Sequence, residues 1–336
     1  LEAFFIILVL AAALMHAFWN LILKKAQDKA VAVMSIFFSS LPLALVGLWV
    51  GGLPKLTALP VILLSAILQT GYSISLFKAY DRGQLSSVYP VARGSAPVFI
   101  FIASYIFFDP EISVRTFVGI LIICVGLIAY GLVQLWQNKE ESQQLAVAII
   151  TGLFIASYSI TDAYGVRLVG SVLSFFGAMA LFNRLFLFLY LIVFERNFLP
   201  RLVRGYQHSF ILGGLISFAC YLIILEAYKH LPVALVSSLR ETSILFAILL
   251  GAVFLKEKMT KDKTALVLVL ALGIVFLYSY DTTLASVSSI HLDEQGDVAG
   301  AAAMAMLIVY ISFLVRGIHT IVSTFLMKRT QAWRNI

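Results

Sequence analysis

The fold is decided by "ARGSAPVFIFIASYIFFDPEISVRTFVGILIICVGLIAY", residues 92–130, because this stretch has a second copy later in the chain. The copy is "LRETSILFAILLGAVFLKEKMTKDKTALVLVLALGIVFL", residues 239–277, and its offset from the first is constant at 147 residues. This offset pairs Arg93 with Arg240 and Gly126 with Gly273. Self-similarity at a fixed offset indicates that the chain contains an internal duplication.

The composition points to a protein that crosses a membrane several times. Hydrophobic residues make up 61% of the chain and charged residues only 12%, about half the charged share of a typical soluble domain. Apolar runs of about 18 or more residues follow one another, which excludes a soluble fold. The net charge of +7 comes from scattered bases that set topology, and no nucleic-acid partner is expected.

The breaks between apolar runs predict ten membrane-spanning helices and an all-α membrane protein. The connections between them are short, with no room for a soluble domain. The two cysteines lie inside apolar runs and are predicted to be packing residues. The predicted spans are 3–23, 30–51, 58–80, 87–108, 114–136, 145–167, 171–194, 209–228, 233–255 and 263–280, with an eleventh near 299–325.

The duplicated unit contains five helices. We therefore predict a ten-helix carrier made of two repeats, residues 1–138 and 139–282, followed by a linker and an appended C-terminal transmembrane helix in residues 283–336. A unit with an odd number of spans must enter the membrane from the opposite side when it is repeated. The result is an inverted repeat, an architecture of alternating-access carriers that places the substrate near the midplane between the halves.

Most loop lysines and arginines follow odd-numbered spans. The positive-inside rule then predicts that these connections face the cytoplasm and that the N-terminus lies outside.

Ionisable side chains at membrane depth are the first candidates for a substrate site, because burying them in the bilayer is costly. Arg93 and Arg240 are predicted to contact substrate, and the alternatives are anchors at helix ends or a structural ion pair. Glu241 is predicted to face Lys229 or a substrate amine. Asn183 and Arg184 lie near the centre of one span, where the alternative to a substrate role is a structural pair between Arg184 and Asp162.

The remaining candidates are polar or aromatic side chains that share helix faces with one another or with the charged residues. The alternatives are an aromatic belt at the membrane interface, or hydroxyl groups that bond to freed backbone near a helix break. These further substrate-site candidates are His16, Trp19, Asn20, Gln69, Tyr72, Ser95, Tyr158, Asp162, Tyr221 and Ser243.

These residue types favour a small zwitterionic substrate. The planar guanidinium of arginine matches the oxygens of a phosphonate or carboxylate, and a buried carboxylate can hold either an ammonium group or a proton. Glu226, Glu241 and Asp162 are the candidates for proton coupling. No enzyme motif accompanies them, so neither a cofactor nor a metal is expected, and the oligomeric state stays open.

Two stretches carry a family resemblance: "HAFWNLILKKA", residues 16–26, and "RETSILFAILLGAVFLKEKMT", residues 240–260. With the weaker copy "RGSAPVFIFIASYIFFDPEIS", residues 93–113, they resemble the EamA-like branch of the drug/metabolite transporter superfamily. The resemblance covers about residues 3–280. It implies a ten-helix secondary carrier in the bacterial inner membrane, without an ATPase or covalent chemistry. It also implies that both termini lie in the cytoplasm, which disagrees with the charge bias.

Within this superfamily the chain most resembles members associated with phosphonate utilisation. Residues 292–335 resemble the C-terminal end of the permease of 2-aminoethylphosphonate importers of the ABC type. The alternative to a carrier is therefore a non-transporting membrane subunit or scaffold associated with a phosphonate uptake system.

Overall fold

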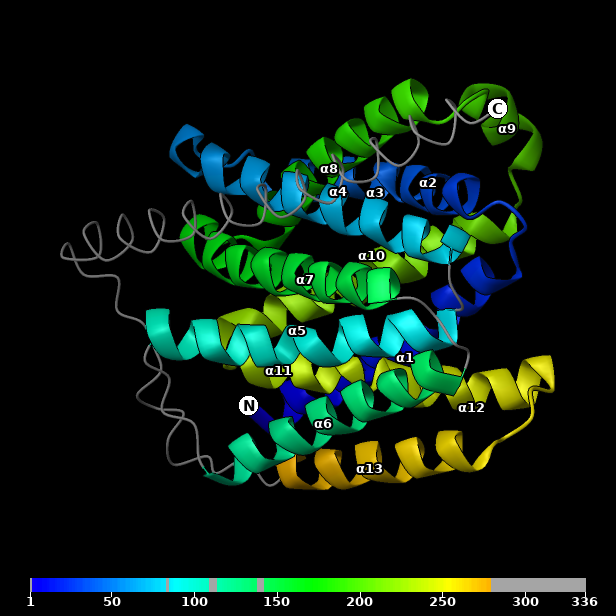
Figure 1. Cartoon of the computed structure of the whole chain (residues 1–336). Coiled ribbons are helices and arrows are strands. Elements are labelled where there is room, and N and C mark those ends of the chain that lie inside the picture. The colour runs from blue at the N-terminus through cyan, green and yellow to red at the C-terminus, as the bar shows by residue number, and fades with distance from the viewer. Residues whose placement is uncertain (1, 83–84, 109–113, 138–141, 279–336) are drawn as a thin grey trace. The chain divides into compact units, whose positions relative to one another are not determined.

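A computed structural model describes residues 2–82, 85–108, 114–137 and 142–278, which form helices and no strand (Figure 1). The chain divides into two compact units, Leu1–Ser288 and Ser289–Ile336, and every described helix belongs to the first. The predicted eleventh span lies outside the described residues. The helices are α1 (Glu2–Lys25), α2 (Lys29–Ser39), α3 (Leu41–Gly51), η1 (Leu56–Ala58), α4 (Leu59–Arg82), α5 (Leu85–Phe108), α6 (Val114–Gln137), α7 (Ser142–Val169), α8 (Val172–Phe194), α9 (Phe198–Gly205), α10 (Ser209–His230), α11 (Val233–Glu241), α12 (Ser243–Leu255) and α13 (Lys261–Tyr278).

Each of the ten predicted spans corresponds to one helix or to one pair of consecutive helices, so the all-α membrane fold is confirmed. Eight segments of the described chain are long and apolar enough to cross a membrane. The other two predicted spans, 87–108 and 263–280, are less apolar, each because of its local sequence. The apolar part of α5 covers only Pro90–Ser104, and α13 begins with the charged run "KDK", residues 261–263.

Two predicted spans are broken, and one predicted loop contains a helix. The span 30–51 divides at Ser40 into α2 and α3, and the span 233–255 divides at Thr242 into α11 and α12. The short helix α9 lies in the connection before α10. Arg201 of α9 pairs with Asp28, the N-cap of α2, at 2.7 Å. This ion pair holds α9 against the start of α2.

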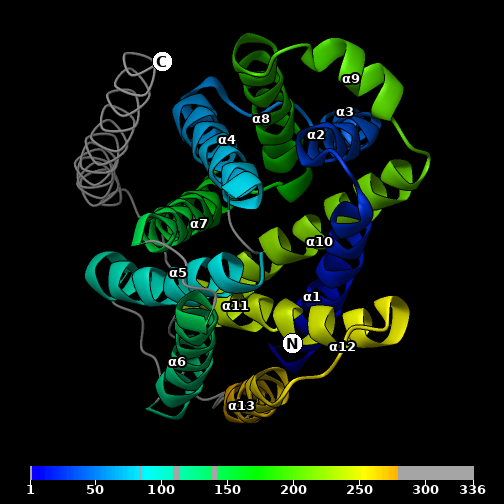
Figure 2. The same ribbon diagram turned by 45° about the vertical axis from the view of Figure 1, so that its right-hand side comes forward.

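Helices of the two repeats pack between one another (Figure 2). In the first unit α1 packs on α10 and α12, α5 on α7, and α6 on α13. The repeat-related glycines form the contact between α6 and α13. A Cβ atom on Gly126 would lie 2.6 Å from Val269 Cγ1, and one on Gly273 would lie 2.5 Å from Ile123 Cγ1. Each repeat therefore supplies one glycine to the same close approach.

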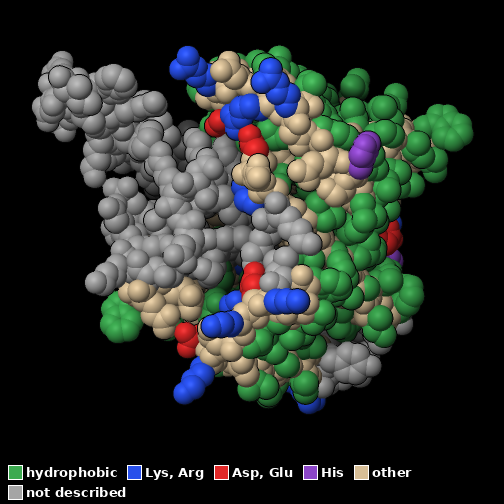
Figure 3. All heavy atoms as spheres, turned by 90° about the vertical axis from the view of Figure 1, so that its right-hand side faces the viewer, with side chains coloured by type: hydrophobic (Ala, Val, Ile, Leu, Met, Phe, Trp, Pro, Cys, Tyr) green, Lys and Arg blue, Asp and Glu red, His purple; other side chains and the backbone are tan. Residues whose placement is uncertain are grey.

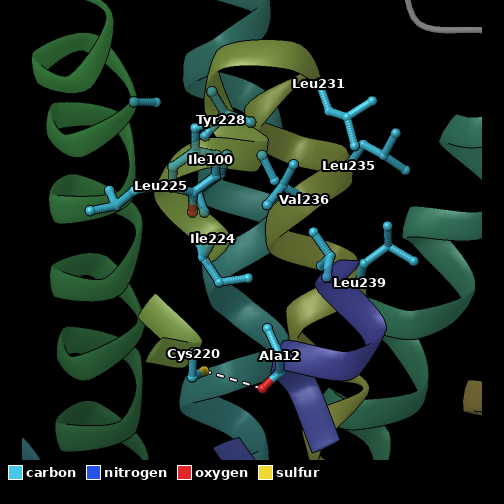
Figure 4. Close-up of a cluster of buried hydrophobic side chains, with 14 of the residues drawn as sticks. Ala12, Ile100, Cys220, Ile224, Leu225, Tyr228, Leu231, Leu235, Val236 and Leu239 are labelled. Carbon is cyan, nitrogen blue, oxygen red and sulfur yellow. Dashed lines mark hydrogen bonds between the residues drawn. The ribbon is translucent and has the colours of Figure 1, made fainter. Parts of the chain in front are cut away.

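The apolar core around α10 and α11 joins helices from both repeats. Figure 4 shows Ile224, Leu235 and Leu239 packed with Ile100 of α5 and Ala12 of α1. Both cysteines are free and buried, as predicted for packing residues.

Figure 3 shows groups of lysine and arginine side chains on one face of the first unit, the right-hand side of Figure 1. They lie over α9 and over the connection from α12 to α13, both of which follow odd-numbered spans. The structure thus places the loops with the strongest positive charge on a common face of the first unit.

The break between α2 and α3 is stabilised by Arg184 of α8. Pro42 has no N–H group, so it cannot bond to the carbonyl of Phe38 one turn earlier. Arg184 donates from Nε to Phe37 O (3.0 Å), from Nη2 to Ser40 Oγ (2.7 Å) and from Nη1 to Ala180 O (2.9 Å). The guanidinium therefore caps the interrupted helix from a neighbouring helix.

Replacing Arg184 with methionine should destabilise the protein, because Phe37 O loses the guanidinium donor that reaches it from α8. Hydrogen bonds to charged groups contribute about 1.5–3 kcal/mol each, so we expect a loss of at least about 2 kcal/mol. Leu185→Met is the matched control, because Leu185 is 48% exposed on the same helix. The check is the unfolding midpoint of the purified proteins, and equal midpoints for the two variants would contradict the assignment.

Candidate functional site

A buried cluster of charged residues lies where α11 ends and α12 begins. Arg93 of α5 binds Glu241 through Nε at 2.9 Å and through Nη1 at 3.3 Å, and its Nη2 donates to Ser243 Oγ at 2.9 Å. Arg240 approaches the same carboxylate less closely, with Nε 3.7 Å from Glu241 Oε1. Arg93, Arg240 and Glu241 are at most 2% exposed. The two repeat-related arginines therefore share one carboxylate.

The carboxylate has no counterpart in the first repeat. The residue at the matching position is Gly94, where a Cβ atom would lie 2.6 Å from Leu127 Cβ. A side chain does not fit there without a shift of α6. Glu241 contacts Arg93 rather than Lys229, whose ammonium group lies 3.3 Å from Glu226. Of the two partners expected for Glu241, Lys229 and a substrate amine, the contact with Lys229 is not formed, and the substrate amine stays a prediction.

A second polar cluster surrounds Asp162 of α7, which is completely buried. Ser65 Oγ and Tyr221 OH donate hydrogen bonds to its carboxylate, and Gln69 Nε2 donates a third at 2.9 Å. Three helices, α4, α7 and α10, meet at this side chain. The alternative in which Asp162 pairs with Arg184 is not formed. Within the described ranges the three hydrogen-bond partners of Asp162 are neutral, and Arg184 bonds at the α2–α3 break.

A line of tyrosine rings connects the two clusters. The guanidinium carbon of Arg240 lies 5.7 Å from the centre of the Tyr158 ring, and Arg240 Nη2 donates to Ser159 Oγ at 3.4 Å. The Tyr158 ring lies 6.4 Å from that of Tyr221, which bonds to Asp162. The centre of the Tyr72 ring lies 5.6 Å from that of Tyr158. The face of an aromatic ring attracts a cation, as it does the guanidinium of Arg240 here.

The polar face of α1 is brought together as the spacing predicted. Trp19 Nε1 donates to His16 Nδ1 at 3.2 Å, and Asn20 Nδ2 donates to the carbonyl of His16 at 2.8 Å. The other ring nitrogen of His16, Nε2, is buried and has no hydrogen-bond partner among the described residues. Trp19 itself is buried, which does not fit an interfacial belt.

Two further candidates make contacts between helices. Asn183 of α8 donates to Thr70 Oγ1 of α4 at 3.0 Å. Ser95 donates to the carbonyl of Ala92 at 3.1 Å and lies against Gly152, where a Cβ atom would come within 2.1 Å of its hydroxyl oxygen. Both side chains therefore lie in close helix contacts. Their substrate roles, like those of the other candidates, stay predictions.

Sequence reasoning missed Ser65 and Ser159. Ser65 lies four residues before Gln69 and seven before Tyr72, so the three share one face of α4. That spacing was a usable signal. Ser159 had none, because it lies among several serine and threonine residues of α7. Within the described ranges no group of three or more His, Cys, Asp or Glu side chains is placed to hold a metal ion.

Comparison with known proteins bears on the family and the fold of the chain. The family model of the EamA-like transporter family matches residues 3–132 and again residues 144–279. The chain is also similar to a solved protein crystal structure at 14% identity, with a TM-score of 0.63 over 85% of this chain and 99% of that one. That likeness shows the fold alone. No curated protein matches the chain.

The two family matches cover most of the chain and correspond to its two five-helix repeats. Together with ten helical spans and a buried polar core shared between the repeats, they lead to one conclusion: the chain belongs to the EamA-like transporter family.

Proposed function

We propose that the chain is a secondary transporter that moves a small polar or zwitterionic metabolite across the bacterial inner membrane by alternating access. Membership of a transporter family supports this class of function over the alternative of a non-transporting subunit or scaffold. Repeats at residues 1–138 and 139–282, of opposite orientation in the membrane, would supply the two halves that alternate. We assign no catalysed reaction.

The observation that carries the proposal is the state of Arg240. Its neighbour Glu241 is held in a two-point ion pair by Arg93, which leaves Arg240 with an acidic contact at 3.7 Å. Its Nε makes no hydrogen bond among the described residues. A buried guanidinium with donor groups left over is suited to bind the oxygens of a carboxylate or phosphonate.

The cationic end of a substrate would lie near the tyrosines. The Tyr158 ring lies near Arg240, Tyr72 and Tyr221, so an ammonium group could rest on these tyrosine rings while the acidic group binds Arg240. An aminophosphonate or an amino acid has this form. The resemblance to phosphonate-associated members makes 2-aminoethylphosphonate the first compound to test. A proton is the coupling ion we propose.

The test of function is uptake into liposomes that contain the purified full chain and no ATP. A panel of 2-aminoethylphosphonate, alanine and choline separates aminophosphonate, amino-acid and purely cationic substrates. Uptake of any panel member above protein-free liposomes supports a carrier. Absence of uptake for all three, with a folded protein, would favour the scaffold.

Replacing Arg240 with glutamine should weaken binding of 2-aminoethylphosphonate about 10- to 100-fold, because charge-assisted hydrogen bonds of about 1.5–3 kcal/mol are lost. Arg240→Lys should lose less, since it retains the charge but not the planar fork. Arg204→Gln, an exposed arginine on α9, is the control. Ligand-dependent thermal shifts measure the affinity, and equal shifts in the wild type and Arg240→Gln would remove Arg240 from the site.

The two arginines should differ in their effect on stability. Arg93→Gln leaves Glu241 buried with only the longer contact to Arg240, and breaking a buried pair in this way costs about 3–5 kcal/mol. Arg240→Gln leaves the close pair intact and should cost less. Unfolding midpoints of the two variants give the comparison. A larger loss in Arg240→Gln would show that Glu241 depends on Arg240 instead.

A further inference from the structure

We propose that Asp162 is the residue that binds the coupling proton, and that the proton and an anionic substrate group bind cooperatively. This inference rests on the proposed transport function and assigns one residue and one direction of coupling to it. Two buried carboxylates lie in the described core, Asp162 and Glu241, and their surroundings differ in kind.

The partners of Asp162 suit both protonation states. Ser65 and Tyr221 have hydroxyl groups, and Gln69 has an amide, so all three can donate to an ionised carboxylate, as they do here. A hydroxyl oxygen or the amide oxygen can equally accept a hydrogen bond from a protonated carboxyl group. Neither state therefore leaves the buried side chain without a partner. No lysine, arginine or histidine of the described chain forms a salt bridge with Asp162.

The surroundings of Glu241 favour only its ionised form. Its carboxylate lies 2.9 Å from the Arg93 guanidinium and accepts a second bond at 3.3 Å. A proton on Glu241 would leave the charge of Arg93 buried without its counter-ion, which is strongly unfavourable. Of the two carboxylates, only Asp162 can change its charge without breaking an ion pair.

Two hydrogen-bond partners of Asp162 are less buried than its carboxylate. The carboxylate is completely buried, but Gln69 and Tyr221, which bond to it, are only half-buried. Gln69 Nε2 also lies 3.2 Å from Tyr221 OH, so the three polar groups form one hydrogen-bonded set. The hydroxyl of Tyr221 can pass a proton to the carboxylate by exchanging its own.

The groups around Asp162 fix the direction of coupling. Arg184 of α8 is directed to the α2–α3 break, and Arg93 is paired with Glu241. Arg240 is connected to Asp162 through the rings of Tyr158 and Tyr221, and the Tyr221 hydroxyl donates to the carboxylate. Among the described residues, the titratable or charged groups on the helices packed around α7 include Tyr72 of α4, Arg93 of α5, Tyr158 of α7 itself, Arg184 of α8, Tyr221 and Tyr228 of α10, and Arg240 and Glu241 of α11.

The balance of charges then links binding of the proton to binding of the substrate anion. With Asp162 ionised, the four groups Arg93, Arg240, Glu241 and Asp162 sum to zero formal charge. A proton on Asp162 leaves one positive charge in excess, beside the arginine that we assign to the substrate anion. Protonation therefore strengthens anion binding, and by reciprocity anion binding strengthens protonation. Proton and anion are expected to cross in the same direction.

Infrared difference spectra of the full chain in lipid, recorded while the pH is changed through neutrality, test the proton site without any substrate. We expect the wild type to show a carbonyl band of a protonated, buried carboxyl group. The band should vanish in Asp162→Asn and persist in Glu241→Gln and in Glu226→Gln, an exposed carboxylate on α10. A band that survives in Asp162→Asn, or no titrating band in the wild type, overturns the proposal.

Transport of labelled 2-aminoethylphosphonate into liposomes tests the coupling. Wild-type protein should accumulate the probe when the interior is made alkaline, and Asp162→Asn should only equilibrate it. The ionisation of the phosphonate itself changes equally for both proteins, so their difference isolates Asp162. Accumulation in Asp162→Asn, or accumulation driven by an acidic interior, contradicts the coupling. If the wild type moves no probe, the substrate assignment fails, and the infrared result still decides the proton site.

Discussion

A broken helix in a bilayer frees backbone groups that no water can reach, and the structure depends on how these groups are satisfied. At the first break Arg184 supplies the donors from a neighbouring helix. At the second, the hydroxyl of Thr242 donates to the carbonyl of Leu239 at 2.6 Å, and the charged residues lie beside it. At the second break, the freed carbonyl is therefore satisfied by the side chain of Thr242, a residue of the break itself. This leaves the neighbouring arginines available for other partners.

The packing of the repeats also decides which polar groups can meet. Because helices of one repeat lie between helices of the other, a residue such as Arg93 can reach Glu241, 148 positions later. Asp162 likewise bonds to Gln69, from the other repeat. Neither polar cluster belongs to one half. A motion that separates the halves must remake hydrogen bonds in both clusters, and their partners are hydroxyl, amide and guanidinium groups that can exchange one ligand for another.

Much of the fold was predictable, because apolar runs and the 147-residue repeat are properties of the chain alone. The break at Ser40 was not predicted, although Pro42 marks it, since proline is tolerated in membrane helices. Helix α9 was missed because it is short and owes its position to the contact between Arg201 and Asp28. Helix periodicity indicated which residues share a face, as for His16 and Trp19. It could not tell which distant residue a buried charge would meet, and for this reason the partners of Arg184 and Glu241 differed from those expected.

The absence of a carboxylate opposite Glu241 has a consequence for energetics. Two identical repeats would give a carrier whose outward-facing and inward-facing forms have equal free energy, because exchanging the roles of the halves changes nothing. Gly94 cannot hold a side chain in its present packing. The carboxylate that the two arginines share, that of Glu241, therefore belongs to the second repeat. Under the alternating access that we propose, the two forms would then differ in how closely an arginine approaches its counter-ion. Such an inequality would set the resting orientation of a carrier before any gradient acts on it, so the empty molecule would favour one of its two orientations.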